Sequence, residues 1–145
     1  MVEVDRYGRL PLHYAALGND IAVAKARLAA GDDVNLGDRK GLTPLHMAAQ
    51  QWSVDVAKLL LDHGAEVDRL NRFGNTPLFV AVFNSKGRGD LITLLRERGA
   101  DPLTANHSGQ TPLGLARLIG NYDVARFFAD LPNQPDSAGG YKSAP

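Results

Sequence analysis

The sequence predicts an all-α solenoid of four stacked helix-turn-helix units, and three observations lead to that fold. A nine-residue phrase returns along the 145-residue chain, most completely at 41–49 as Gly-Leu-Thr-Pro-Leu-His-Met-Ala-Ala. Its copies begin at Gly8, Gly41, Gly74 and Gly109, so the first two steps are 33 residues and the last is 35. Each copy leads into two short apolar segments with a polar interruption between them. A fixed period of this length indicates stacked supersecondary units rather than one globular core.

Each unit begins with a turn that carries a glycine at its tip, because glycine tolerates the positive φ of a tight turn. Three positions before the glycine stands a short polar residue that can bond nearby backbone amides, namely Asp5, Asp38, Asn71 or Asn106. Thr-Pro follows the turn at 43–44, 76–77 and 111–112. Threonine is a good N-cap and proline suits the first helical position, so each phrase starts a helix. Unit one has Leu10 in place of threonine, and its first helix therefore lacks that cap.

The two segments of each unit differ in character. The first is short and contains small residues such as Ala48 and Ala49, which let neighbouring helices approach closely. The second segment of a unit, for example 54–61, is followed by a glycine that suits a helix C-cap. In units one to three these glycines are Gly31, Gly64 and Gly99. Short extended links then lead into the next turn and predict hairpin-like fingers at 33–35, 66–68 and 101–103.

The repeat divides a domain of residues 1–131 into units at about 4–36, 37–69, 70–104 and 105–131. The second helix of unit one is alanine-rich with polar interruptions, which fits a capping unit with a wetter outer face. Unit three carries two extra residues between its helices, within 83–90, and these predict a longer basic loop beside the concave surface of the stack. The tail, 132–145, is rich in Pro, Gly, Ser and Ala, and we expect it to be flexible.

The phrase Gly-x-Thr-Pro-Leu-His-x-Ala-Ala, followed by Leu-Leu-x-x-Gly-Ala at a 33-residue period, resembles the ankyrin repeat over about residues 4–131. The resemblance implies an L-shaped stack whose fingers project at a right angle. It also implies binding of other proteins through the finger tips and the inner, concave face formed by the first helices, with catalysis rare. Trp52 stands where the family normally has glycine. Arg117 replaces the second alanine of the phrase, which marks unit four as the C-terminal cap.

Composition excludes several classes of function. The formal net charge is zero, which gives no overall attraction to nucleic acid or anionic membranes. Cysteine is absent, so disulfides, thiolate metal sites and cysteine nucleophiles are excluded. Neither a signal peptide nor an apolar stretch of about 18 residues is visible. We therefore expect a cytoplasmic protein that is monomeric alone, with no membrane association and no cofactor.

The sequence gives little support for metal binding or catalysis. His13 and His46 recur at the repeat period, which could indicate a metal array, but the family resemblance implies that such histidines bridge the backbones of adjacent loops. The acidic pairs Asp32 with Asp33 and Glu66 with Asp68 could serve acid–base catalysis, and we interpret them as a solvated edge. No phosphate-binding loop, metalloprotease motif or nucleophile elbow occurs, so we predict no catalytic and no metal site.

Recognition residues are instead expected on variable positions between the phrases. On the fingers these are Arg6, Tyr7, Arg9, Arg39, Lys40, Leu42, Arg72, Phe73, Asn75, His107 and Gln110. At the ends of the first helices they are Leu17, Gln50, Gln51, Trp52 and Phe83, and in the insertion Lys86 and Arg88. Stacking places equivalent positions side by side, so the finger arginines should form a basic row, and the indole of Trp52 should project toward the inner face.

Two interpretations of this row remain open at the sequence level. The arginines could pair with Asp5, Asp38 and neighbouring carboxylates, although exposed pairs contribute only about 0–1 kcal/mol. Alternatively they form an interface, which we favour because aromatic residues accompany the charges.

We therefore predict a non-catalytic module that binds a partner protein with an acidic surface. It would act as inhibitor or immunity partner of a toxic enzyme, because the segment 83–90 resembles small stand-alone bacterial ankyrin proteins, several of which have that role. The alternatives are an adaptor in a regulatory complex or, less favoured, nucleic-acid binding through the basic row.

Overall fold

A computed structural model describes residues 3–132 and confirms the all-α repeat fold. Within these residues the chain forms seven α-helices and one 3₁₀ helix, and no β-strand. The predicted tail lies outside the described residues from position 133 onward. The helices are α1 Pro11–Gly18, α2 Ile21–Ala29, α3 Pro44–Gln51, α4 Val54–Asp62, α5 Pro77–Phe83, α6 Asp90–Glu97, α7 Pro112–Leu118 and η1 Ala125–Phe128.

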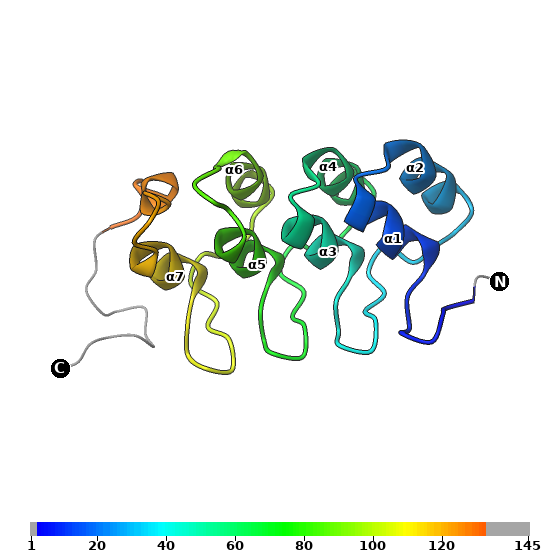
Figure 1. The fold of residues 1–145 in the computed structure, drawn as a ribbon, viewed down its shortest axis with the longest axis horizontal. Coiled ribbons are helices and arrows are strands. Elements are labelled where there is room, and N and C mark those ends of the chain that lie inside the picture. The colour runs from blue at the N-terminus through cyan, green and yellow to red at the C-terminus, as the bar shows by residue number, and fades with distance from the viewer. Residues whose placement is uncertain (1–2, 133–145) are drawn as a thin grey trace.

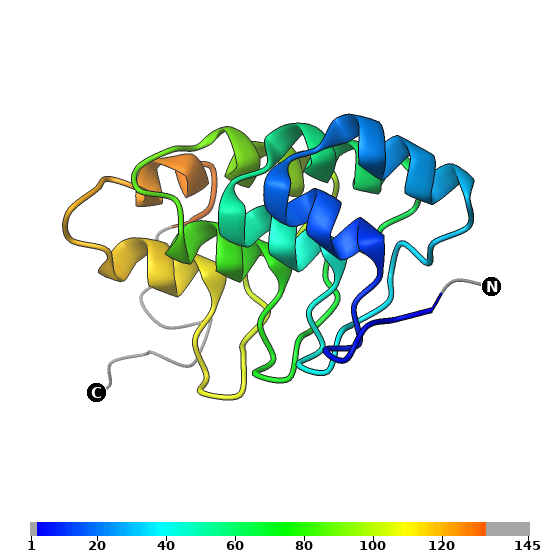
Figure 2. The ribbon, with the colours of Figure 1, turned by 45° about the vertical axis from the view of Figure 1, so that its right-hand side comes forward.

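The helices lie in two rows, from which the loops between units project as fingers (Figure 1). One row contains the first helices α1, α3, α5 and α7, and the other contains α2, α4, α6 and η1. Each first helix packs on the next, and α2, α4 and α6 pack in the same order. The view turned by 45° shows the fingers following one another along the stack (Figure 2). We call the surface over the first helices the inner face.

Threonine caps start the first helices of units two, three and four, as the sequence predicts. The hydroxyl oxygens of Thr43, Thr76 and Thr111 each accept a hydrogen bond from the backbone amide three residues later. Such caps contribute about 1 kcal/mol each. Leu10 supplies no side-chain cap in unit one; its own amide donates to Nδ1 of His13 instead, at 2.9 Å.

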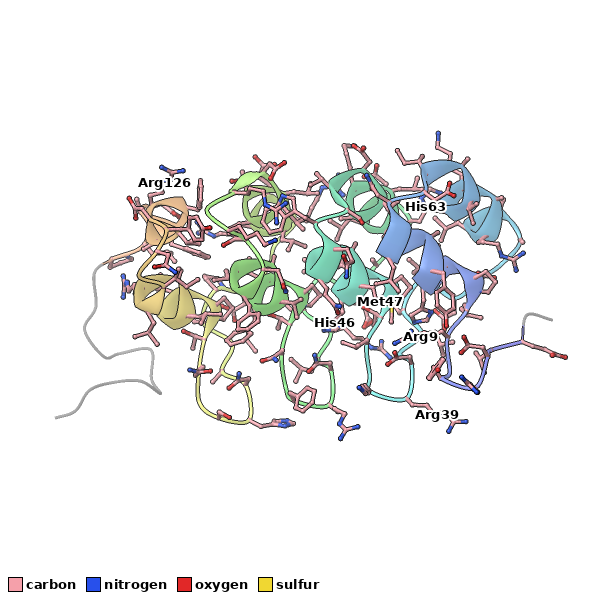
Figure 3. The ribbon with its side chains drawn as sticks, viewed as in Figure 1. Arg9, Arg39, His46, Met47, His63 and Arg126 are labelled. Atoms are coloured by element: carbon pink, nitrogen blue, oxygen red, sulfur yellow. The ribbon has the colours of Figure 1, made fainter. Side chains whose placement is uncertain are left out.

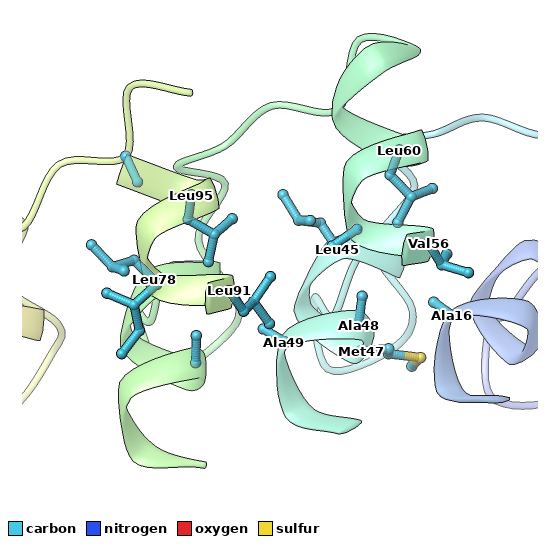
Figure 4. Close-up of a cluster of buried hydrophobic side chains, with 14 of the residues drawn as sticks. Ala16, Leu45, Met47, Ala48, Ala49, Val56, Leu60, Leu78, Leu91 and Leu95 are labelled. Carbon is cyan, nitrogen blue, oxygen red and sulfur yellow. The ribbon is translucent and has the colours of Figure 1, made fainter. Parts of the chain in front are cut away.

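The core is a line of aliphatic side chains between successive helix pairs. Leu45, Leu60, Leu78 and Leu95 are among its fully buried members. Figure 4 shows these side chains filling the space between units, with Met47 directed toward Ala16 of the preceding unit. Each buried leucine contributes about 1.5–3 kcal/mol, so most of the stability comes from contacts between neighbours in the stack.

The outer side of the first unit carries apolar and polar side chains together. Tyr14 and Val23 are 42% and 41% exposed, whereas their repeat counterparts Met47 and Val56 are 1% and 0% exposed. Arg27 of α2 stands where unit two has the fully buried Leu60, and its side chain is 31% exposed, so the outer side of this helix also carries a charged group.

The fourth unit has a 3₁₀ helix where a second α-helix was expected. Its backbone bonds span three residues, as from Phe127 N to Val124 O at 3.0 Å. The carbonyl of Phe127 instead accepts a bond from Arg96 Nη1 at 3.0 Å. Arg96 also holds both carboxylate oxygens of Asp130, at 2.7 and 2.8 Å. Unit three thus fixes the end of the stack through one arginine.

The prediction of a solvated acidic edge is wrong for Asp32. This residue is 6% exposed, forms an ion pair with Arg27 at 3.0 Å and accepts a bond from Leu12 N at 3.3 Å. Asp68 is half-buried and accepts a bond from Asp101 N, and its burial raises its pKa. Both carboxylates therefore stabilise junctions of the chain, a role that their spacing in the sequence does not reveal.

Candidate functional site

The four fingers are closed by the same set of hydrogen bonds. In each, one side-chain oxygen accepts bonds from the backbone amides two and four residues later, at distances of 2.9 to 3.0 Å. The residues that do so are Asp5, Asp38, Asn71 and Asn106. Because these side chains are used to form the turn, the two carboxylates among them belong to the scaffold.

Backbone hydrogen bonds also connect each finger to the next. Arg39 N donates to Tyr7 O at 2.9 Å, Arg72 N to Lys40 O at 3.0 Å, and His107 N to Phe73 O at 3.1 Å. The tip residues are thereby held in one row at the repeat spacing. Figure 3 shows Arg39 at the end of its finger and Arg9 closer to the helices.

The charged groups of this row fall into two sets. Arg9 forms an ion pair with Asp38 at 3.1 Å, and its side chain is 24% exposed. Arg6, Arg39 and Arg72 are exposed and take part in no ion pair within residues 3–132. The interpretation that the finger arginines pair with finger carboxylates therefore holds for Arg9 alone.

Aromatic rings and polar groups accompany the charges. The guanidinium groups of Arg6 and Arg72 lie 5.1 and 5.3 Å from the ring centres of Tyr7 and Phe73. Tyr7 and Phe73 are themselves exposed, as are Lys40 and His107. Leu42, Asn75 and Gln110 are half-buried, and their carbonyls accept bonds that close the fingers, which makes these three residues part of the finger framework.

The recurring histidines bridge neighbouring units. His13 Nε2 donates to the carbonyls of Leu36 and Leu42, at 3.0 and 3.1 Å. His46 Nε2 donates to Asn75 O at 2.9 Å, and its Nδ1 accepts from Thr43 N at 3.2 Å. Carbonyl oxygens only accept, so the proton lies on Nε2 in both rings. Burial lowers the pKa of His46 from 6.5 to about 4 and lowers that of His13 too.

The ends of the first helices form a second line across the stack. Equivalent positions in the four units hold Leu17, Gln50, Phe83 and Leu118. Phe83 is 70% exposed and Leu118 63%, whereas Leu17 is half-buried and Gln50, like its neighbour Gln51, is exposed and polar. The inner face is consequently polar over unit two and strongly apolar over units three and four.

Comparison with known families agrees with this geometry. A family model described as ankyrin repeats, in three copies, matches residues 12–106. The chain belongs to the ankyrin-repeat family. A search of curated proteins found no match. Ankyrin repeats are generally protein–protein interaction modules and are typically non-catalytic.

This ankyrin-repeat chain departs from the regular pattern at the two-residue insertion after α5. Trp52 does not project freely over the inner face, because its Nε1 donates to Asp90 Oδ1 at 2.8 Å and Arg88 lies 4.4 Å from its ring centre. Arg88 also donates to the carbonyls of Ser85 and Asn84, at 2.8 and 3.0 Å. The loop 84–89 is therefore fastened to unit two, and sequence reasoning missed this contact.

The same loop supports the C-terminal cap of the ankyrin stack, which leads to a stability prediction. A Cβ atom on Gly89 would lie 2.0 Å from Cε1 of Phe127, so that ring sits directly on the glycine. We expect Gly89→Ala to lower the free energy of unfolding by about 1–3 kcal/mol, because the ring must move from its packed position. Urea denaturation measures the change.

Gly18→Ala is the matched control for this substitution. A Cβ atom on Gly18, at the end of α1, would have no neighbour within 4 Å. Alanine there should leave stability unchanged or raise it by up to about 1 kcal/mol. Equal stability of the two variants would show that Phe127 does not depend on Gly89.

Across 3–132, no cluster of three or more His, Cys, Asp or Glu side chains could bind a metal ion. No helix in that range combines the length and apolar character that crossing a membrane requires.

Proposed function

We propose that the protein is a non-catalytic module that binds a partner protein through its finger tips and inner face. The row of Arg6, Arg39 and Arg72 carries this proposal, because these exposed cations are aligned by backbone bonds and have no ion-pair partner within residues 3–132. Such a row attracts and orients an acidic surface. The backbone bonds also lower the ordering cost of association, since the tips are held in place before the partner arrives.

Aromatic side chains supply the apolar part of the proposed interface. Tyr7 and Phe73 stand beside the arginines, and Phe83 extends from the inner face. Aromatic and arginine residues are the types that most often dominate binding energy at interfaces. The proposed surface thus runs from the charged tips to the apolar ends of α5 and α7.

Charge reversal at two finger tips tests the proposal. The partner is first captured from the native host and identified by mass spectrometry. The double variant Arg39→Glu, Arg72→Glu should then bind that partner at least about tenfold more weakly, because close charge pairs across interfaces couple by about 1.5–7 kcal/mol. Calorimetry measures the affinity, and the melting temperature should stay nearly constant.

Lys25→Glu with Lys58→Glu provides a control with the same change in net charge. These exposed lysines lie on α2 and α4, away from the fingers. The proposal would be contradicted if Arg39→Glu, Arg72→Glu bound the partner as tightly as the unaltered protein. It would also be contradicted if the lysine variant lost as much affinity as the arginine variant. A partner that proves to be nucleic acid, with affinity that falls steeply as salt rises, would replace it.

Within protein binding we favour an inhibitor or immunity role over an adaptor role, on the resemblance of segment 83–90 to small bacterial ankyrin proteins. An inhibitor should abolish one enzymatic activity of its captured partner at a one-to-one dose. An adaptor should bind the same partner and leave its activity intact.

A further inference from the structure

A cavity of about 300 Å³ opens on the inner face between units three and four. Its apolar wall consists of Phe83, Leu115, Ile119 and Tyr122, and its polar lining residues are Ser85, Lys86 and Asn121. A smaller hollow of about 180 Å³ lies on the other side of Phe83, against Val80. The larger cavity is at the lower limit of small-molecule sites, a size suited to a single bulky side chain.

The insertion of unit three forms one wall of this cavity. Lys86 and Gly87 both adopt left-handed backbone conformations, with φ of 52° and 85°. A Cβ atom on Gly87 would lie 2.9 Å from Cδ1 of Tyr122, so the tyrosine ring rests on the glycine. Because Arg88 bonds the carbonyls of Asn84 and Ser85 at the same time, the wall is held before any ligand binds.

Two polar groups at the cavity lack partners. Ser85 is 1% exposed, and its hydroxyl has no hydrogen-bond partner within residues 3–132. A buried hydroxyl without a hydrogen-bond partner lowers the stability of the fold. Lys86 is exposed at the mouth and forms no ion pair within the same residues. An apolar chamber with a cation at its mouth suits an apolar side chain next to a carboxylate.

We propose that this cavity is an anchor site that receives one bulky apolar side chain of an acidic partner segment, with a carboxylate of that segment at Lys86. The proposal rests on the proposed function and specifies the chemistry of the partner. It also explains why Phe83 stays exposed, since the ring forms the ridge against which the partner side chain packs. The finger arginines then receive further acidic groups of the same partner.

N-acetyl-L-phenylalanine is a suitable probe, because it combines one apolar side chain with one carboxylate. Titrated into the full-length ¹⁵N-labelled protein, it should shift the backbone amide signals of 85–87 and 119–122 in a saturable way. The expected dissociation constant is on the order of 1 mM, given the small size of the probe. The corresponding amide, which lacks the charge, should bind about two- to fivefold more weakly, and N-acetylglycine should give no saturable shift.

Gly120→Leu is designed to fill the cavity, because Gly120 lines it and a Cβ atom there would have no neighbour within 4 Å. The shifts should vanish in this variant and persist in Gly18→Leu, which changes an unobstructed glycine at the other end of the stack. Absence of saturable shifts in the unaltered protein, or their persistence in Gly120→Leu, would overturn the anchor site. Either result leaves the finger-tip test unaffected, so failure of the two proposals can be told apart.

Discussion

Replacing His46 with alanine is expected to lower the free energy of unfolding by about 3 kcal/mol. The imidazole is fully buried and joins Thr43 N to Asn75 O, so its loss leaves the Thr43 amide without a partner and removes one of the two hydrogen bonds that Asn75 O accepts. An unsatisfied buried amide costs about 1–3 kcal/mol, and the lost second bond and the vacated space add to the loss. Against a typical stability of about 5–15 kcal/mol, this is a large fraction.

Urea denaturation followed by the fluorescence of Trp52 measures this effect, since Trp52 is the single tryptophan and contacts unit three. His46→Phe is the informative control, because unit three has Phe79 at the equivalent position and buries it. Phenylalanine restores the packing but not the two hydrogen bonds. A phenylalanine variant as stable as the unaltered protein would show that His46 acts by filling space.

Acidification is expected to destabilise the protein by roughly 3 kcal/mol through His46 alone. The pKa of this residue is about 4 in the folded protein, against 6.5 when it is exposed. The contribution is fully present above pH 6.5 and is lost as the pH falls toward 4, because the unfolded chain takes up the proton first. A protonated Nδ1 would also face the amide donor of Thr43. About 2 kcal/mol of the loss should occur between pH 7 and pH 5.

The measurement compares urea denaturation at pH 7 and pH 5 in the unaltered protein and in His46→Phe. Asp62 and Asp130 do not interfere, because their arginine partners lower their pKa values below the ordinary 3.8. Asp68 acts in the opposite direction but is common to both proteins. His13 contributes with the same sign as His46, so the variant should retain a reduced slope. Identical slopes in the two proteins would contradict a depressed His46 pKa.

Much of the fold could be predicted because its determinants are local and repeated. The threonine caps, the turn glycines and the polar residues Asp38 and Asn71 act within four positions of themselves, so their roles follow from spacing. The repetition also predicts the stacking, because a constant period places equivalent residues of every unit side by side. The exception is unit four, where Arg96 of unit three takes a carbonyl and the second helix becomes 3₁₀.

The binding surface was only partly predictable. The basic row could be predicted from the repeat period. Which finger arginines form ion pairs depends on the direction of each side chain, and Arg9 is the one that pairs with a carboxylate. Trp52 was expected to be free and is instead bonded to Asp90, a residue 38 positions away. Ser85 and Tyr122 were not among the predicted recognition residues, because nothing local marks a residue that lines a cavity.

The sequence by itself therefore determined the repeat, the helix starts, the finger turns and the line of exposed arginines. Only the tertiary structure decided how the insertion of unit three joins its neighbours, through Arg88 on Trp52 and through Tyr122 and Phe127 on its glycines. The physical reason is the range of the interactions. Caps and turns are satisfied within a few residues, whereas the packing of rings on a loop depends on where stacking places distant segments.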